Sequence, residues 1–127
     1  MDLQQLFEEI LPGNRLPAQQ VASVTCDSRQ VWRGSVFVCI AGSLTDGHNY
    51  VVQALQRGAI LVVAQRDCGV PNQLLFPDTR IVYARLCAAF FGYPARKLKL
   101  LGVTGTNGKT TTAWLTHHAL IQLGVKA

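Results

Sequence analysis

The sequence predicts an α/β fold in two parts: a small N-terminal α/β domain, followed by the first strand, turn and helix of a second, truncated α/β domain. Two observations support this prediction. Between residues 3 and 90, apolar runs of strand length alternate with segments whose apolar residues recur at helical spacing. At residues 98–123, an apolar run, a glycine-rich turn and a helical pattern follow one another. Alternation of this kind is typical of parallel sheets covered by helices.

The N-terminal part begins with a predicted amphipathic helix over residues 3–10. Asp2 and Gln5 stand where a capping box would place them, and Pro12-Gly13 ends the pattern. Strands are predicted over residues 21–25, 35–40, 60–64 and 74–76, and a helix over residues 50–57.

A second long helix is predicted to begin at Asp78 or Thr79 and to end at Gly92. Because this helix leads into the second apolar run, we expect the boundary between the domains near residue 78, which gives domains of residues 1–78 and 79–127. Residues 98–103 are predicted to form a strand, and a helix is predicted from Thr110 to about Leu123, with Gly124 as its C-terminal glycine.

The run LLGVTGTNGKTTT at residues 100–112 has the composition of a phosphate-binding loop. Glycines let backbone N–H groups converge on phosphate oxygens, Lys109 supplies a positive charge for the phosphates, and the Thr110 hydroxyl can ligate Mg²⁺. The strict pattern has glycine where this chain has Val103, and a glycine-rich surface turn with a solvated lysine is the alternative. We expect a nucleotide triphosphate to bind this loop, at Gly105, Thr106, Asn107, Gly108, Lys109, Thr110 and Thr111.

The composition indicates a globular chain with a packed core, because 49% of the residues are hydrophobic and 15% are charged. No segment is long and apolar enough for a transmembrane helix, and the acidic N-terminus has no basic leader, which predicts a cytoplasmic protein. The net charge of +5 is spread along the chain without a basic run. We therefore expect small anionic ligands rather than nucleic acid or a membrane surface.

The four cysteines are widely spaced and include no C-x-x-C pair. This spacing predicts free thiols in the core rather than a disulfide framework or a zinc site. The consecutive His117 and His118 point in different directions on a helix, and are predicted to be ordinary helix residues rather than metal ligands.

Two further segments precede or follow predicted strands: Thr25–Arg29, which contains DSR, and residues 41–48, AGSLTDGH. Each by itself is compatible with an ordinary turn in which Asp and Ser bond the local backbone. Together, the string from Asp27 to Ala59 resembles the N-terminal domain of the Mur ligase family, with DSR, G-x-x-F-V, G-x-x-x-D-G-H and A-x-x-x-G-A in order. VTGTNGKTTT resembles the ATP-binding loop of the same family, and its combination with DSR most resembles the MurE type.

The resemblance implies that the full-length protein is an ATP-dependent ligase of peptidoglycan precursor synthesis. Such an enzyme adds a diamino acid, lysine or meso-diaminopimelate, to UDP-N-acetylmuramoyl-L-alanyl-D-glutamate through an acyl phosphate. The uridine-diphosphate end of that precursor is expected at Cys26, Ser28, Ser43, Leu44 and Thr45. ATP and Mg²⁺ are expected at the phosphate loop, with Lys109 as catalytic residue and Thr110 as metal ligand. The 127 residues alone are expected to be inactive.

Two other interpretations remain open at this point. One is a non-catalytic module that binds a uridine nucleotide, and the other is an unrelated P-loop NTPase such as a kinase or GTPase, which leaves the string from Asp27 to Ala59 unexplained. Within the turn that contains Asp46, His48 either contacts substrate or braces the turn.

Overall fold

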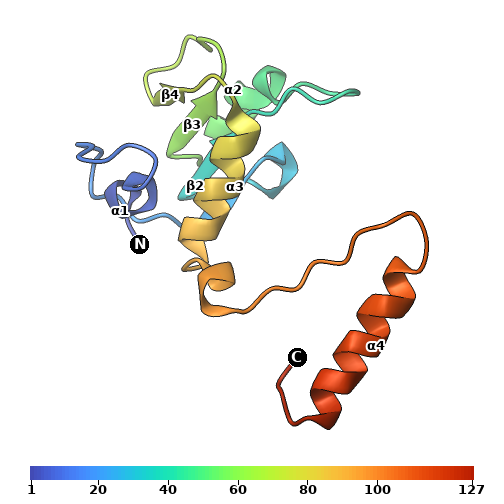
Figure 1. The fold of residues 1–127 in the computed structure, drawn as a ribbon. Helices are drawn as coiled ribbons and strands as arrows, with labels where there is room; N and C mark the ends of the chain where they lie inside the picture. Colours follow the sequence, from blue (N-terminus) through green and yellow to red (C-terminus); the bar gives the residue numbers. More distant parts are fainter. The chain divides into compact units, whose positions relative to one another are not determined.

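Four parallel strands form the centre of the N-terminal part of the chain in a computed structural model that describes all 127 residues. Figure 1 shows this sheet with the helices around it. The strands are β1 (Ser23–Thr25), β2 (Ser35–Val38), β3 (Leu61–Ala64) and β4 (Gln73–Leu75), and they lie side by side in sequence order. Each predicted strand of this part is therefore present: the first three are one or two residues shorter than predicted, and the fourth is shifted by one residue. All neighbouring pairs run parallel, so every strand ends at the same edge of the sheet.

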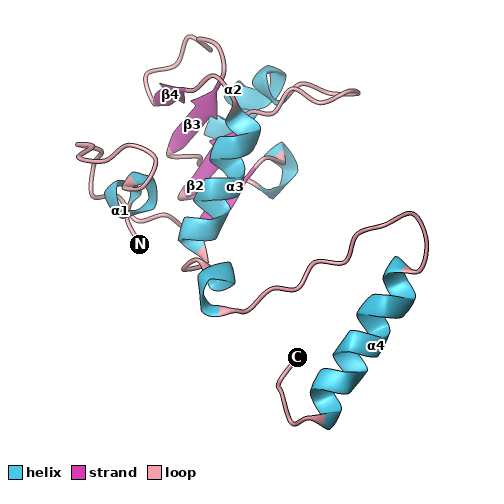
Figure 2. Cartoon of the chain, in the orientation of Figure 1, coloured by secondary structure: helices cyan, strands magenta, loops and turns pink.

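The two central strands, β2 and β3, are buried at every position because helices cover both faces of the sheet. Successive side chains of β2 point to opposite faces. Val36 and Val38 pack in one hydrophobic cluster with residues of α1 (Leu3–Phe7) and α3 (Thr79–Phe90). Phe37 and Cys39 pack in a second cluster with residues of α2 (Val51–Gln56). Figure 2 shows the helices around these strands.

Helix α1 confirms the predicted capping box. The carboxylate of Asp2 accepts a hydrogen bond from the backbone N–H of Gln5 at 2.8 Å, and the Gln5 side chain accepts one from the Asp2 N–H at 3.0 Å. The helix ends at Phe7, whereas the apolar repeat predicted a helix to Ile10. Ile10 still packs against the same core from the turn that follows, which is why it fits the apolar repeat.

Helix α3 belongs to the first of two compact units, which span Met1–Pro94 and Ala95–Ala127. The boundary expected near residue 78 thus lies about one helix too early in the chain. Three apolar residues of α3, Val82, Leu86 and Ala89, complete the core on one face of the sheet. The buried Thr79 hydroxyl also donates a hydrogen bond of 2.6 Å to the carbonyl oxygen of Cys39, just after β2. These contacts tie α3 to the sheet that precedes it.

Short 3₁₀ helices complete the chain: η1 (Ser28–Gln30), η2 (Gly47–Tyr50) and η3 (Pro94–Lys97). In the second unit, α4 (Lys109–Gln122) confirms the predicted helix and ends in a Schellman arrangement, with Gly124 at φ +78°. Its N–H groups at Gly124 and Val125 bond the carbonyls of Ile121 and Leu120.

The prediction of a strand at residues 98–103 is wrong, because the structure has no strand there. Leu98, Leu100 and Leu101 are each more than 60% exposed. A strand needs a neighbour with which to share its backbone hydrogen bonds, and within this chain no segment pairs with residues 98–103. The apolar pattern is that of a buried strand, but the pairing that it requires is missing.

We expect the substitution Thr79→Val to destabilise the first unit by about 1–3 kcal/mol, because it leaves the buried carbonyl of Cys39 without its donor while keeping the side-chain volume. Urea denaturation followed by circular dichroism measures the change. Thr104→Val, at an exposed position of the second unit, is the matched control. An unchanged midpoint for Thr79→Val would show that α3 does not depend on this hydrogen bond.

Candidate functional site

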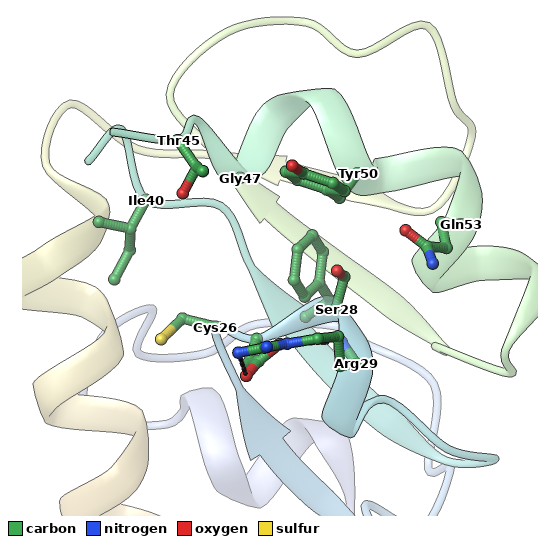
Figure 3. A pocket seen from close by; sticks show the side chains of 10 residues that line it. Cys26, Ser28, Arg29, Ile40, Thr45, Gly47, Tyr50 and Gln53 are labelled. Carbon is green, nitrogen blue, oxygen red and sulfur yellow. Dashed lines mark hydrogen bonds and ion pairs between the residues drawn. The ribbon is translucent and has the colours of Figure 1, made fainter. Parts of the chain in front are cut away.

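A pocket of about 420 Å³ opens at the carboxyl ends of β1 and β2. Ligands of α/β proteins commonly bind at this edge, where the strands deliver loops rather than regular structure. The walls come from the turn after β1, the loop after β2 and the start of α2, as Figure 3 shows. The lining residues are Cys26, Asp27, Ser28, Arg29, Phe37, Ile40, Thr45, Gly47, Tyr50 and Gln53.

The DSR turn forms one wall and is held by its own aspartate. Asp27 caps η1, with its carboxylate accepting a hydrogen bond of 2.9 Å from the Arg29 N–H. The same carboxylate binds the Arg29 guanidinium through two hydrogen bonds, of 3.0 Å to Nε and 2.9 Å to Nη2. The Arg29 side chain and backbone thereby lower the pKa of Asp27. This two-point contact fixes the plane of the guanidinium at the pocket wall.

The DGH turn forms a second wall and depends on a buried histidine. Asp46 accepts hydrogen bonds from the backbone N–H and from Nδ1 of His48, at 3.0 and 2.6 Å. These bonds lower the pKa of Asp46 to about 2. Arg66 reaches the other carboxylate oxygen at 3.0 Å. Because Arg66 follows β3, its ion pair with Asp46 holds the turn to the carboxyl end of that strand.

His48 braces this turn, which is the second of the two roles that the sequence left open for it. Its Nε2 accepts a hydrogen bond of 3.0 Å from the N–H of Gln65, directly after β3. Because Nε2 accepts a hydrogen bond, the ring proton is on Nδ1, which donates a hydrogen bond to Asp46. Both ring nitrogens are thus occupied, and the side chain is only 1% exposed.

Gly47 is required where the loop returns to the sheet. A Cβ at this position would lie 2.9 Å from the Ile40 nitrogen and 3.1 Å from the Cys39 Cα, which is closer than packed side chains approach a backbone. The absence of a side chain therefore brings the DGH turn against the end of β2, and this places Thr45 and Tyr50 on either side of it at the pocket.

The structure brings three of the five residues expected to bind precursor to this pocket: Cys26, Ser28 and Thr45. Ser43 and Leu44 lie outside its lining, at the exposed end of the same loop, where Leu44 is 96% exposed. The backbone N–H groups of residues 43–45 make no hydrogen bond within the chain. They remain available to an anionic group beside the pocket.

Seven of the ten lining residues were not expected as site residues from the sequence, and three of these seven, Arg29, Tyr50 and Gln53, have polar side chains with no structural role found for their exposed groups or faces. Arg29 lies within the DSR motif, so its proximity to Ser28 was the available signal. Tyr50 is the N-cap of α2 and Gln53 lies in its first turn, three residues later, a spacing that places side chains on the same side of a helix. Their sequence pattern alone is that of a common surface helix.

The residues expected to bind ATP all lie in the second unit and are all exposed. Gly108 has φ +74°, the left-handed conformation, and precedes the first residue of α4, Lys109. No side chain caps this helix, so the first N–H groups of α4 are unpaired at its positive end. Lys109 and Thr110 are exposed in the first turn. This arrangement suits phosphate oxygens.

Free cysteines are confirmed, since the chain has no disulfide. Only Cys39 is fully buried; Cys26 is exposed and the other two are partly exposed, so the expectation of core thiols holds for one residue. Burial raises the pKa of Cys39 to about 12. No group of three or more His, Cys, Asp or Glu side chains could hold a metal ion. His118 stacks on Trp114, at 5.4 Å between ring centres.

Comparison with known proteins identifies the family of this chain. Residues 20–91 match the family described as "Mur ligase family, catalytic domain". The match begins just before β1 and ends just after α3, so it covers the whole sheet and the pocket. The chain belongs to the Mur ligase family.

The named relatives are of the MurE type, as the combination of DSR with the phosphate loop predicted. The chain is 43% identical over 126 residues to the UDP-N-acetylmuramyl-tripeptide synthetase of Roseiflexus sp. (strain RS-1), which covers 94% of this chain and 25% of that protein. It is 42% identical over 131 residues to the UDP-N-acetylmuramoyl-L-alanyl-D-glutamate--2,6-diaminopimelate ligase of Geobacillus thermodenitrificans (strain NG80-2), covering 100% and 26%. The chain therefore spans about a quarter of the length of these relatives.

Solved structures of Mur ligases share the fold. The crystal structure of MurF from Acinetobacter baumannii superposes with a TM-score of 0.70 at 29% identity, over 96% of this chain and 28% of that one. MurF from Thermotoga maritima in complex with ADP gives a TM-score of 0.55 at 30% identity, over 74% and 21%. Among the helices of the present structure, none has the length and apolar character needed to cross a membrane.

The brace at Asp46 makes a pH-dependent prediction. Because its pKa is lowered in the folded state, to about 2, the carboxylate stabilises the fold above the ordinary aspartate pKa of about 4. This contribution is lost as the pH falls from about 4 to about 2. We expect Asp46→Asn to lower the urea midpoint at pH 6, with a difference from wild type that shrinks toward pH 2.

Urea midpoints of the two proteins between pH 6 and pH 2 test this, with Glu8→Gln, an exposed carboxyl of the first unit, as control. A wild-type minus Asp46→Asn difference that stays constant across this range would contradict the role assigned to the carboxylate.

Proposed function

We propose that this chain is the N-terminal part of an ATP-dependent ligase that adds a diamino acid to UDP-N-acetylmuramoyl-L-alanyl-D-glutamate in the cytoplasm. In this proposal the first unit binds the uridine-diphosphate end of the precursor, and the second unit begins the domain that binds ATP. Both named relatives are enzymes of this step, and the name of the Geobacillus protein includes 2,6-diaminopimelate. The added amino acid is accordingly diaminopimelate or lysine.

The observation that carries the precursor site is a set of unsatisfied polar groups around one pocket. The hydroxyls of Ser28 and Thr45 make no hydrogen bond within the chain, and both face the pocket. Because polar groups of a folded protein normally find partners, groups that converge unpaired on a cavity are suited to a polar ligand. Ser28 would bond the uracil or the ribose, and Cys26 would contact the base.

The diphosphate would lie beside this pocket, against residues 43–45. Their free backbone N–H groups are donors for phosphate oxygens. Ser43 and Leu44 take part through their backbone, which is consistent with their side chains lying outside the pocket lining. This separates two functions within one loop: Thr45 at the pocket, and the two preceding residues at the anion.

The γ-phosphate of ATP would be held by Gly105–Thr111. The free N–H groups at the start of α4 and the Lys109 ammonium would neutralise charge on the phosphates while the γ-phosphoryl group moves to the D-glutamyl carboxylate. The products of that step are ADP and an acyl phosphate. The amine of the incoming amino acid then displaces phosphate and forms the amide bond.

The residues of this chain fit Mg²⁺ only in part. Thr110 offers one hydroxyl oxygen in the first turn of α4, and no cluster of carboxylates accompanies it. A bound Mg²⁺ supplies charge neutralisation between the phosphate oxygens. Its remaining ligands would come from the nucleotide, from water and from parts of the enzyme other than these residues. For the same reason the 127 residues alone are proposed to lack ligase activity.

Backbone amide NMR of the chain tests both sites at once. UDP is expected to shift the amides of Cys26, Ser28 and residues 43–45, and ADP with Mg²⁺ is expected to shift those of Gly105–Thr111. Ser28→Ala should weaken UDP binding about 2- to 10-fold, the loss of one hydrogen bond, without changing the response to ADP.

Lys109→Ala is the reciprocal variant, and should weaken ADP–Mg²⁺ binding while leaving the UDP shifts in place. Lys126→Ala, at an exposed lysine that follows the C-terminal end of α4, is its matched control. If UDP moved no amide of the pocket in the folded chain, the precursor site would be wrong. If ADP moved no amide of the phosphate loop, the nucleotide site of the second unit would be wrong.

A further inference from the structure

We infer that the uracil ring of the precursor is held in a slot between the aromatic ring of Tyr50 and the guanidinium of Arg29, with its edge read by the side-chain amide of Gln53. This deepens the proposed function and rests on it. The inference begins from three of the lining residues that the sequence did not mark as site residues. They come from two different walls: Arg29 from η1, and Tyr50 and Gln53 from the end of η2 and the first turn of α2.

The two flat groups lie on opposite sides of the pocket. Figure 3 shows the ring of Tyr50 on the α2 side and the guanidinium of Arg29 on the η1 side, both nearly edge-on, with the Ser28 hydroxyl between them. Phe37, which is fully buried, also lines the pocket. A space walled by two planar groups and lined by an aromatic side chain fits a planar ring better than it fits a sugar.

Arg29 is held in place before any ligand binds. The two hydrogen bonds from its guanidinium to the Asp27 carboxylate use one edge of the planar group, and Arg57 donates a further bond of 2.9 Å to the Arg29 carbonyl oxygen. The faces of the guanidinium stay open, since the side chain is 83% exposed. Guanidinium planes fixed in this way stack on bases at little cost in side-chain entropy. The aspartate of the DSR turn is therefore a positioning residue for the slot.

Tyr50 and Gln53 have no competing partner. Neither the Tyr50 hydroxyl nor the Gln53 amide makes a hydrogen bond within the chain, although both line the pocket. Uracil has one N–H donor, at N3, flanked by two carbonyl acceptors. The amide of Gln53 presents an acceptor and a donor side by side, which matches N3–H and one neighbouring carbonyl. Stacking gives the slot affinity for a base, and this pair of hydrogen bonds gives it a preference for uracil.

The test compares UDP with inorganic pyrophosphate, which has the two phosphates and no base. Titrations of the 127-residue chain are followed by backbone amide NMR. Tyr50→Leu should weaken UDP binding about fivefold or more, the loss of a stacking contact, and leave the pyrophosphate response at residues 43–45 unchanged. Tyr50→Phe, which keeps the ring, should bind UDP much more tightly than Tyr50→Leu does. Gln56→Leu, on the exposed face of α2, is the matched control for the helix.

The edge contact has its own test in 3-methyl-UDP, in which a methyl group replaces the N3 proton. Wild type should bind it more weakly than UDP, and Gln53→Leu should bind the two nearly equally. If wild type bound UDP at the pocket amides and Tyr50→Leu bound it equally well, the slot would be wrong while the proposed function stood. If wild-type pocket amides did not respond to UDP at all, the proposed function itself would fail. If Tyr50→Leu also lost the pyrophosphate response, the site would have been disrupted and the Tyr50→Phe and 3-methyl-UDP comparisons would decide.

Discussion

The parallel pairing of β2 with β3, buried between two layers of helices, is the constraint on which the rest of the first unit depends. Val36 pairs with Leu61 and Val38 with Val63, and every side chain of both strands is buried. Parallel strands share one carboxyl edge, so the turns after β1, β2 and β3 emerge together. The pocket forms there because the sheet brings DSR, the glycine loop and the start of α2 to the same edge.

The pocket is shaped by polar side chains that already have hydrogen-bond partners within the chain. The ligand-binding role is proposed for the polar side chains that have no such partner. Asp27 and Asp46 each hold a turn through carboxylate hydrogen bonds, and His48 ties the second turn to the end of β3. These three residues are fully occupied by structural contacts. Ser28, Thr45, Tyr50 and Gln53 are held by the same turns, but their polar groups have no partner in the chain. This division separates the frame of the site from its binding groups.

The two units differ in how completely their apolar residues are covered. In the first unit, buried residues of α1, β2, β3 and α3 form a packed core, although Trp32 and Phe91 are exposed. The second unit has no buried residue. In the second unit, Leu98, Leu100 and Trp114 are each more than 60% exposed. Apolar patterns of this kind normally lie against other structure. The chain spans about a quarter of the length of its relatives.

The sequence by itself determined most of the elements and both motifs. The capping box at Asp2, the four strands of the sheet, the glycine at the end of α4 and the resemblance carried by DSR and TGTNGKTTT all follow from local residue patterns, because caps, turns and strand periodicity are short-range properties. Only the tertiary structure decided the rest. It assigned α3 to the first unit through Thr79 and Leu86, and it left residues 98–103 without a strand partner. It also turned His48 into a brace and brought Tyr50 opposite Arg29. Each of these depends on contacts between residues far apart in the chain, which no local pattern encodes.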